Sequence, residues 1–443
     1  MSEFSFNQQE LCDLATQVLE QAASQGATAC DVDVSEGYGQ NISVRLGEVE
    51  TIEYNRDKGV GVTVYLGQQK GHASSSDFSA AAIKDTVKAA LAIARFTAAD
   101  SFAGLPDADR LATSFPDFDL YHPWDLSVEG AIALATECED AARDVDARIS
   151  NSEGASVSTG ASRFVYANSL GFMGAECSSR YSLSAAVIAE DESGMQRDYW
   201  YSSARSYLDL DSAVAVGQRA GERSLRRLGA RRVKTGEYPV LFESPVASGL
   251  IGAFVQAVSG SSLYRKSSFL PDSLGTSVFA PCVSIAEDPF LKKGMSSGAF
   301  DAEGVATVAR DVVSQGVLNG YFLSSYSARK LGMSTTGNAG GSHNLLVAST
   351  HTFAQLLAEL GTGLFVTELL GHGTNMVTGD YSRGAAGFWV ENGVIQYAVE
   401  EITIAGNLRD IFKDIVGIGD DSQRWSSRKV GSILVSKMTV AGE

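Results

Sequence analysis

The chain has 443 residues, enough for two or three domains, and its hydrophobic content of 44% is typical of a globular protein with a large core. Its formal net charge of -18, from 53 acidic and 35 basic residues, opposes contact with phosphates, so direct nucleic-acid binding is not expected. Five scattered cysteines without a CxxC pair suit a reducing cytoplasm, and neither a signal peptide nor a membrane-spanning apolar run is expected.

The N-terminal region is predicted to begin with a helix. Asn7 is a suitable N-cap, Glu10 completes a capping box, and Gly26 ends the run of helically spaced apolar residues. Alternating apolar and polar residues then predict strands in DVDVSEG, NISVRLGEVETIEYN and GVGVTVYLG. A second helix, from about Phe78 to Phe96, completes a first α+β segment over residues 1–115.

The next segment, residues 116–231, repeats this order after a proline-containing linker. A helix is predicted from about Ser127 to Val145, followed by strands and by a helix from about Asp211 to Arg227. The strands are expected in GASVSTG, SRFVYANS, FMGAECSSRYSLSAAVIAED and MQRDYWYSSARSY. Because helix, strands and helix occur twice, we predict an N-terminal α+β region made of two related halves.

Residues 232–443 are predicted to form a β-rich C-terminal domain with a large mixed sheet or barrel. Many short strands separated by glycines follow one another here, interrupted by a helix near Thr352–Glu359 that ends at Gly361. The segment GFWVENGVIQYAVE predicts a hairpin, in which Asn392 and Gly393 form a type I′ turn between alternating strands. The whole chain is therefore expected to have an α+β fold.

The histidines do not predict a metal site. None of His72, His122, His343, His351 and His372 lies in an HExxH pattern. Glu368 and His372 are four residues apart, but the β-branched residues and glycines around them favour a strand, on which four residues span roughly 13 Å. That separation is too large for joint ligation of one ion.

Two short patterns found in serine enzymes also occur, and we reject them. Ser327–Lys330 matches S-x-x-K, and Lys234–Gly236 matches K-T-G. Their order along the chain is the reverse of that in penicillin-binding enzymes, and no S-D-N sequence is present. The match is therefore attributed to chance.

The segment GLIGAFVQAVSGSSLYRKSSFL, residues 249–270, predicts a helix followed by a basic turn. Its apolar residues recur at helical spacing, so one face is expected to be buried. Gly249 and Gly252 would allow another group to approach the helix closely, and Arg265 and Lys266 suit the negative end of the helix dipole. Taken alone, this is a packing helix without a His, Glu, Asp or Cys.

Three long segments resemble the TldD/PmbA family, specifically its PmbA (TldE) branch. They are GLIGAFVQAVSGSSLYRKSSFLPDSLG, SSYSARKLGMSTTGNAGGSHN and GTGLFVTELLGHGTNMVTGDYSRGAAGFWVENGVIQYAVEEITIAGNL. The resemblance covers nearly the whole chain and is dense over residues 235–420. In that family, TldD-type subunits carry an HExxxH helix and a C-terminal Cys as zinc ligands, and they act as metallopeptidases together with PmbA (TldE) subunits. The pair is associated with maturation of a peptide antibiotic and with degradation of an antitoxin, and an older link is to modulation of DNA gyrase.

The resemblance implies that this chain has no catalytic residue and holds no metal or other cofactor. The family's two His and its Glu match Gly252, Ala257 and Ala253, and its Cys matches Val430. We therefore predict the non-catalytic subunit of a cytoplasmic metalloprotease, whose TldD-type partner supplies zinc, water activation and the general base. An unfolded peptide is the expected substrate. A homodimer is the alternative assembly for the chain when it is isolated from its partner.

Five residues are predicted to contact the peptide or the partner subunit: Arg265, Arg329, Lys330, His343 and Arg383. Two alternatives stay open. One is a regulatory protein that binds DNA gyrase, with which the acidic charge is compatible. The other is an autonomous peptidase that uses an unrecognised site and depends on His343, His351 or His372.

Overall fold

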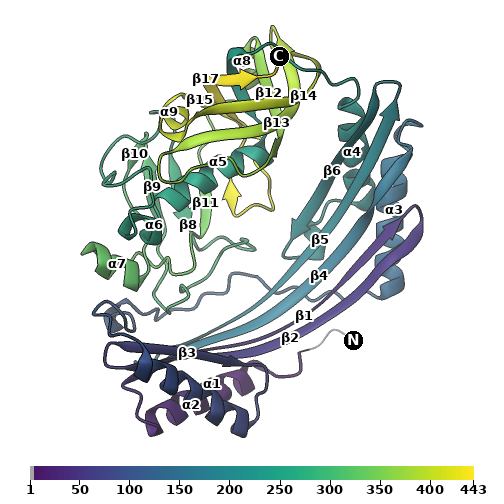
Figure 1. Cartoon of the computed structure of the whole chain (residues 1–443). Coiled ribbons are helices and arrows are strands. Elements are labelled where there is room, and N and C mark those ends of the chain that lie inside the picture. The colour runs from purple at the N-terminus through teal and green to yellow at the C-terminus, as the bar shows by residue number, and fades with distance from the viewer. Residues whose placement is uncertain (1–3) are drawn as a thin grey trace.

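A long, curved antiparallel sheet forms the N-terminal part of the molecule (Figure 1). The computed structural model describes residues 4–443. The six strands have the order β3-β2-β1-β4-β5-β6. They are β1 (Ala29–Arg45), β2 (Glu48–Leu66), β3 (Gln69–Ser75), β4 (Asn151–Asn168), β5 (Met173–Asp191) and β6 (Gly194–Ala204). The central pair, β1 and β4, joins parts of the chain more than 100 residues apart into one continuous sheet.

Four helices cover one face of this sheet, two at each end (Figure 1). They are α1 (Gln8–Ser24), α2 (Ala80–Phe96), α3 (Val128–Arg143) and α4 (Ala213–Arg226). The order α1-β1-β2-β3-α2 is repeated as α3-β4-β5-β6-α4, as the recurring pattern predicts. The predicted capping box of the first helix is present, with Asn7 Oδ1 accepting from the Glu10 amide and the Glu10 carboxylate accepting from the Asn7 amide.

One predicted strand is wrong as a continuous element. The segment NISVRLGEVETIEYN contains a hairpin turn at Leu46 and Gly47, where β1 ends and β2 begins. Both residues have positive φ, at 52° and 79°, as a two-residue hairpin requires. The alternation continues through a turn this short, so the pattern does not reveal it. The buried Glu139 of α3 accepts from both amides at 2.8 and 2.9 Å and fixes the turn.

The remaining strands, all C-terminal to residue 235, form two sheets in the part of the chain here called the C-terminal domain. One has the order β14-β13-β12-β7-β17-β15, and a further β14–β17 pairing closes five of its strands into a barrel. The other has the order β10-β9-β8-β11-β16. The strands are β7 (Gly236–Phe242), β8 (Ile285–Asp288), β9 (Arg310–Ser314), β10 (Val317–Leu318), β11 (Asn344–Val347), β12 (Gly363–Leu370), β13 (Asp380–Glu391), β14 (Val394–Asn407), β15 (Ile415–Ile418), β16 (Arg428–Lys429) and β17 (Ile433–Ala441). This arrangement confirms the expected β-rich domain with a barrel.

Five helices accompany these sheets: α5 (Ser244–Ala257), α6 (Gly260–Tyr264), α7 (Ser325–Leu331), α8 (Phe353–Leu360) and α9 (Leu408–Lys413). Helix α5 shares the main core with both sheets, and α8 covers the opposite side of the barrel sheet. The predicted turn of the β13–β14 hairpin is confirmed, with φ of 52° at Asn392 and 75° at Gly393. No helix among the described residues is long and apolar enough to span a bilayer.

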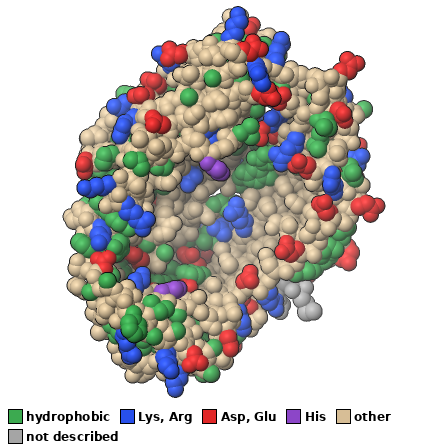
Figure 2. Space-filling view, in the orientation of Figure 1, with side chains coloured by type: hydrophobic (Ala, Val, Ile, Leu, Met, Phe, Trp, Pro, Cys, Tyr) green, Lys and Arg blue, Asp and Glu red, His purple; other side chains and the backbone are tan. Residues whose placement is uncertain are grey.

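The C-terminal domain contacts the curved sheet near both of its ends and lies over its uncovered, concave face (Figure 1). At the α4 end, the Arg223 guanidinium lies between Asp198 and Glu243, and Trp425 contacts Trp200 with ring centroids 6.0 Å apart. At the α2 end, the side chains of α7 bind the loop that follows α2. The space between these two junctions, here called the hollow, stays open (Figure 2).

Candidate functional site

The concave face of the sheet, which forms the floor of the hollow, is polar. Every second residue of the central strands points to this side, and most of them are serine or glycine. A cavity of about 660 Å³ lies here, lined mainly by Gly37, Asn55, Asp57, Ser158, Gly160, Ser162, Ser178, Arg180, Ser182, Tyr201, Ser203 and Arg205. Small hydroxyl-bearing side chains leave room for a ligand and offer it hydrogen bonds.

Two arginines stand out on this floor. Arg180 Nε donates to Ser203 Oγ at 3.2 Å, and Arg205 donates to the carbonyls of Ser179 and Met295. Burial lowers the pKa of Arg205, the neighbouring Arg180 lowers it further, and only Glu176 acts in the opposite direction. Lys and Arg side chains are visible inside the hollow in Figure 2. The acidic chain therefore places positive charge in its interior space.

The helix α5 carries the positions matched to the zinc-binding helix. Gly252 and Ala253 are half-buried, whereas Ala257 and, on the segment after β16, Val430 are buried. A Cβ atom on Gly252 would lie 2.9 Å from Arg428 Nη1 and 3.4 Å from Arg428 Cζ. The guanidinium thus packs directly on the bare backbone of α5.

These residues do not fit a zinc ion. Zinc in proteins is held by the nitrogen, sulfur or oxygen atoms of His, Cys, Asp or Glu, and none of the four matched side chains has such an atom. The guanidinium of Arg428 would also repel a divalent cation at this place. Among residues 4–443, no group of three or more His, Cys, Asp or Glu is placed to hold a metal ion.

Three of the predicted contact residues lie close together on α6 and α7. Arg329 donates to the carbonyls of Phe102, Gly104 and Leu105, and Lys330 lies 3.5 Å from Asp100. Their side chains therefore hold the junction between the C-terminal domain and the loop after α2. Arg265, at the end of α6, donates to the hydroxyl of Tyr264, whose ring contacts Tyr326 of α7.

The other two predicted residues lie elsewhere. His343 Nδ1 is 3.2 Å from the carboxylate of Glu287, which is 1% exposed and also receives hydrogen bonds from Arg310 and Asn338. These contacts pull the pKa of Glu287 below its ordinary value against the effect of burial. Arg383 lies on β13, where it reaches the carbonyl of Leu369. The structure thus does not bring the five residues into one site.

The predicted strand around Glu368 is confirmed, since Glu368 belongs to β12 and His372 follows it. The Glu368 carboxylate accepts a hydrogen bond of 2.5 Å from Arg227, the residue that follows α4. Its carboxylate is therefore part of the junction between the two parts of the molecule.

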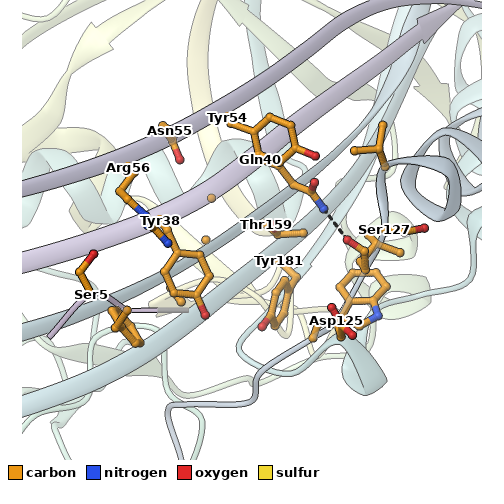
Figure 3. Close-up of a pocket in the computed structure, with 17 residues that line it drawn as sticks. Ser5, Tyr38, Gln40, Tyr54, Asn55, Arg56, Asp125, Ser127, Thr159 and Tyr181 are labelled. Carbon is orange, nitrogen blue, oxygen red and sulfur yellow. Dashed lines mark hydrogen bonds between the residues drawn. The ribbon is translucent and has the colours of Figure 1, made fainter. Parts of the chain in front are cut away.

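A second, separate pocket of about 780 Å³ opens on the helix-covered face (Figure 3). It occupies the gap between the two helix pairs, where Tyr38, Tyr54 and Tyr181 point into it and the Gln40 amide donates to the Leu126 carbonyl at 3.0 Å. Because Tyr38 and Gln40 alternate with the floor residues of β1, this pocket and the hollow lie on opposite faces of the sheet.

Arg180, Arg205 and Arg428 were not identified from the sequence. Serine or glycine at every second position of β4 and β5 is the signal for a polar concave face, and Arg180 lies in that series. For Arg428 no local signal exists, because its significance depends on contact with Gly252, 176 residues earlier in the chain.

Comparison with known proteins gives consistent matches over most of the chain. Three family models match: PmbA/TldA metallopeptidase domain 1 at residues 30–94, the central domain at 121–228 and the C-terminal domain at 235–442. The chain is 47% identical over 437 residues to the metalloprotease PmbA of Escherichia coli O157:H7, covering 98% of this chain and 97% of that protein. A metalloprotease TldD homologue of Haemophilus influenzae is 23% identical over 85% of this chain and 82% of its own length.

Solved structures show the same fold. A candidate modulator of DNA gyrase from Bacteroides thetaiotaomicron superposes with a TM-score of 0.93 at 28% identity, covering 99% of this chain and 100% of that one. TldE from Thermococcus kodakarensis superposes with a TM-score of 0.85 at 17% identity, covering 97% of this chain and 100% of that one.

Proposed function

The chain belongs to the PmbA/TldA metallopeptidase family, and from that premise we propose that it is the non-catalytic subunit of a two-subunit metalloprotease. Its partner is a TldD-type subunit that carries the zinc ion, and the complex acts on unfolded peptides in the cytoplasm. The relatives named above include a TldD homologue and a TldE, which supports a pairing of this type.

The proposal rests on the residue types that α5 and Val430 present at the positions of the family's metal site. At the positions matched to the family's zinc ligands, the chain has Gly252, Ala253, Ala257 and Val430, and the guanidinium of Arg428 lies against the first of them. Water activation and general-base catalysis need a metal-bound water and a carboxylate or imidazole. This chain supplies neither at that place, so in the proposal the chemistry belongs to the partner.

The role left to this chain is to enclose and position the peptide. An extended peptide gains affinity from backbone hydrogen bonds and from pockets for alternate side chains. The hollow contains serine hydroxyls and two arginines, and the space between the two junctions is unfilled. These groups suit an extended, polar chain better than a folded surface.

The test is cleavage of an unfolded peptide together with metal analysis. The chain alone is expected to be inactive and to bind no stoichiometric zinc, whereas a mixture with a TldD-type subunit is expected to cleave and to contain zinc in the partner. Substitution of the partner's own zinc ligands is the matched control, because it should abolish cleavage by the mixture. Zinc-dependent cleavage by the isolated chain would overturn the proposal.

A second candidate function is binding to DNA gyrase, which the similarity to candidate gyrase modulators favours. It predicts that the purified chain alone changes the supercoiling activity of gyrase. An autonomous peptidase is the remaining alternative, and the contact of His343 with the buried Glu287 is the feature that such an enzyme would use. H343A should then abolish cleavage by the isolated chain.

A further inference from the structure

The half-buried guanidinium of Arg428 faces no counter-ion among residues 4–443. Burial lowers its pKa, and no carboxylate contributes in the opposite direction. Among residues 4–443 no hydrogen bond or ion pair of its guanidinium is recorded, although Arg424, four residues earlier, is paired with Asp211 at 2.7 Å. Removing a cation from water without a partner costs free energy, so an anionic group beside Arg428 would be bound favourably.

The surroundings of Arg428 leave that place open. The α5 face beside it consists of Gly249, Gly252, Ala253 and Gln256, of which Gly249 and Gln256 are exposed. A Cβ on Gly249 would meet no atom within 4 Å, while a Cβ on Gly252 would meet the guanidinium. The guanidinium is thus supported from one side by α5, and small side chains leave room for a ligand along the helix.

The backbone at Arg428 is also suited to an extended ligand. Residues Arg428 and Lys429 form β16, which pairs with β11 on one side and is the outer strand of its sheet. Just before it, Trp425 contacts Tyr201, a residue that lines the floor cavity, with ring centroids 5.5 Å apart. The segment that leads into β16 therefore starts beside the hollow, at Trp425.

We propose that Arg428 binds a carboxylate group of an extended peptide in the hollow, at the place where related subunits hold their metal ion. The guanidinium presents two donors in a fork that matches the two oxygens of a carboxylate. The peptide backbone lies along the edge of β16, and Arg180 and Arg205 on the floor of the hollow add positive potential. This inference deepens the proposed function and rests on its premise that a peptide enters the hollow.

The experiment measures binding of fluorescein-labelled, unstructured ten-residue peptides to the full isolated chain by fluorescence anisotropy. One peptide has a free C-terminal carboxylate, one is C-terminally amidated, and one is amidated but contains a single internal Glu. Binding of the acid peptide, and its loss on amidation, is expected if the C-terminal carboxylate is the ligand. Recovery with the internal Glu would assign the same site to acidic side chains. Equal binding of all three peptides would overturn the inference.

The decisive variant is R428Q, which removes the charge and keeps much of the side-chain length. Affinity for the acid peptide should fall roughly tenfold to a hundredfold, the range for loss of a charge-assisted hydrogen bond, and the difference between acid and amide should disappear. R95Q is the matched control, because it removes the same charge from an exposed arginine in the last turn of α2, on the helix-covered side of the sheet. If R428Q binds the acid peptide as tightly as R95Q and the unmodified chain do, the inference is wrong.

Two glycine substitutions on α5 test whether peptide binding depends on the position of the Arg428 guanidinium. G252A should displace the guanidinium and weaken binding of the acid peptide, whereas G249A, one turn earlier and facing open space, should not. Both replace a glycine inside a helix, so neither is expected to lower stability through helix propensity. Equal affinity of G252A and G249A would contradict the proposed position of the ligand.

Because these measurements use the chain without its partner, they are independent of the cleavage assay. If the mixture with a TldD-type subunit cleaves and R428Q binds normally, the carboxylate site is refuted and the proposed function stands. If R428Q loses the acid peptide but the mixture never cleaves, the carboxylate site stands and the proposed function fails.

Discussion

Replacing Arg223 should weaken the junction between the curved sheet and the C-terminal domain. Its guanidinium is 2.7 Å from Glu243 at the start of α5 and 3.3 Å from Asp198 of β6, and the three side chains are 11%, 12% and 7% exposed. The two carboxylates hold the pKa of Arg223 above its ordinary value although burial opposes this. R223M would leave both carboxylates buried without this cation, and Asp198 would keep the Tyr199 amide at 2.7 Å and the more distant Arg227 at 4.0 Å.

Breaking a buried ion pair by removing one partner costs roughly 3–5 kcal/mol, and we expect about 3 kcal/mol here because Asp198 keeps a weaker partner. The assay is urea unfolding followed by tryptophan fluorescence, to which Trp200 and Trp425 at this junction contribute. The control is R232M, which breaks an ion pair with Glu401 whose side chains are 51% and 65% exposed and should cost less than about 1 kcal/mol. If R223M and R232M lowered the free energy of unfolding equally, the argument that burial strengthens the Arg223 ion pairs would be refuted.

Three further predictions concern other parts of the fold. Burial raises the pKa of Asp301 from 3.8 to about 6, so protonation favours the folded state, and stability should fall as the pH rises from about 4 to about 6. D301N lacks this titration, and urea midpoints across that range should change less for D301N than for the unmodified chain. G393A should destabilise by roughly 1–2 kcal/mol, because φ is 75° and the added Cβ would lie 3.1 Å from Ala358 Cα; an unchanged urea midpoint would contradict this. R329Q should release the loop after α2, measured as severalfold faster hydrogen exchange at residues 98–110. K330Q, which breaks a partly exposed ion pair with Asp100 and a cation–π contact with Phe102, should have a smaller effect.

Local patterns in the sequence were sufficient for many elements. The predicted N-cap Asn7, the predicted helix start near Ser127 and the terminating Gly361 mark helix ends that the structure has within two residues. The Asn392-Gly393 pair placed the β13–β14 hairpin correctly, since few other residues accept two successive positive φ angles. The turn at Leu46 was missed because leucine is an unusual residue for such an angle.

The charge composition could not indicate the character of the hollow. A net charge of -18 describes the whole chain, whereas Arg180 and Arg205 become neighbours only through strand pairing, and Arg428 meets Gly252 only through a tertiary contact. The contacts of Arg329 and Lys330 with the loop after α2 also arise only in the tertiary structure, because more than 200 residues separate these partners in the sequence. Hydrogen bonds across such separations leave no periodic signal in a sequence.

The sequence by itself determined the elements whose causes are local: the helix faces, the caps, the alternating strands and the repeated order of helix, strands and helix. It also determined that α5 lacks zinc-ligating side chains, because that is a matter of residue identity. Only the tertiary structure decided that the two halves share one sheet through β1 and β4, and that Arg428 packs on Gly252. Both depend on long-range contacts, whose free energy comes from burial and pairing between segments that no local pattern connects.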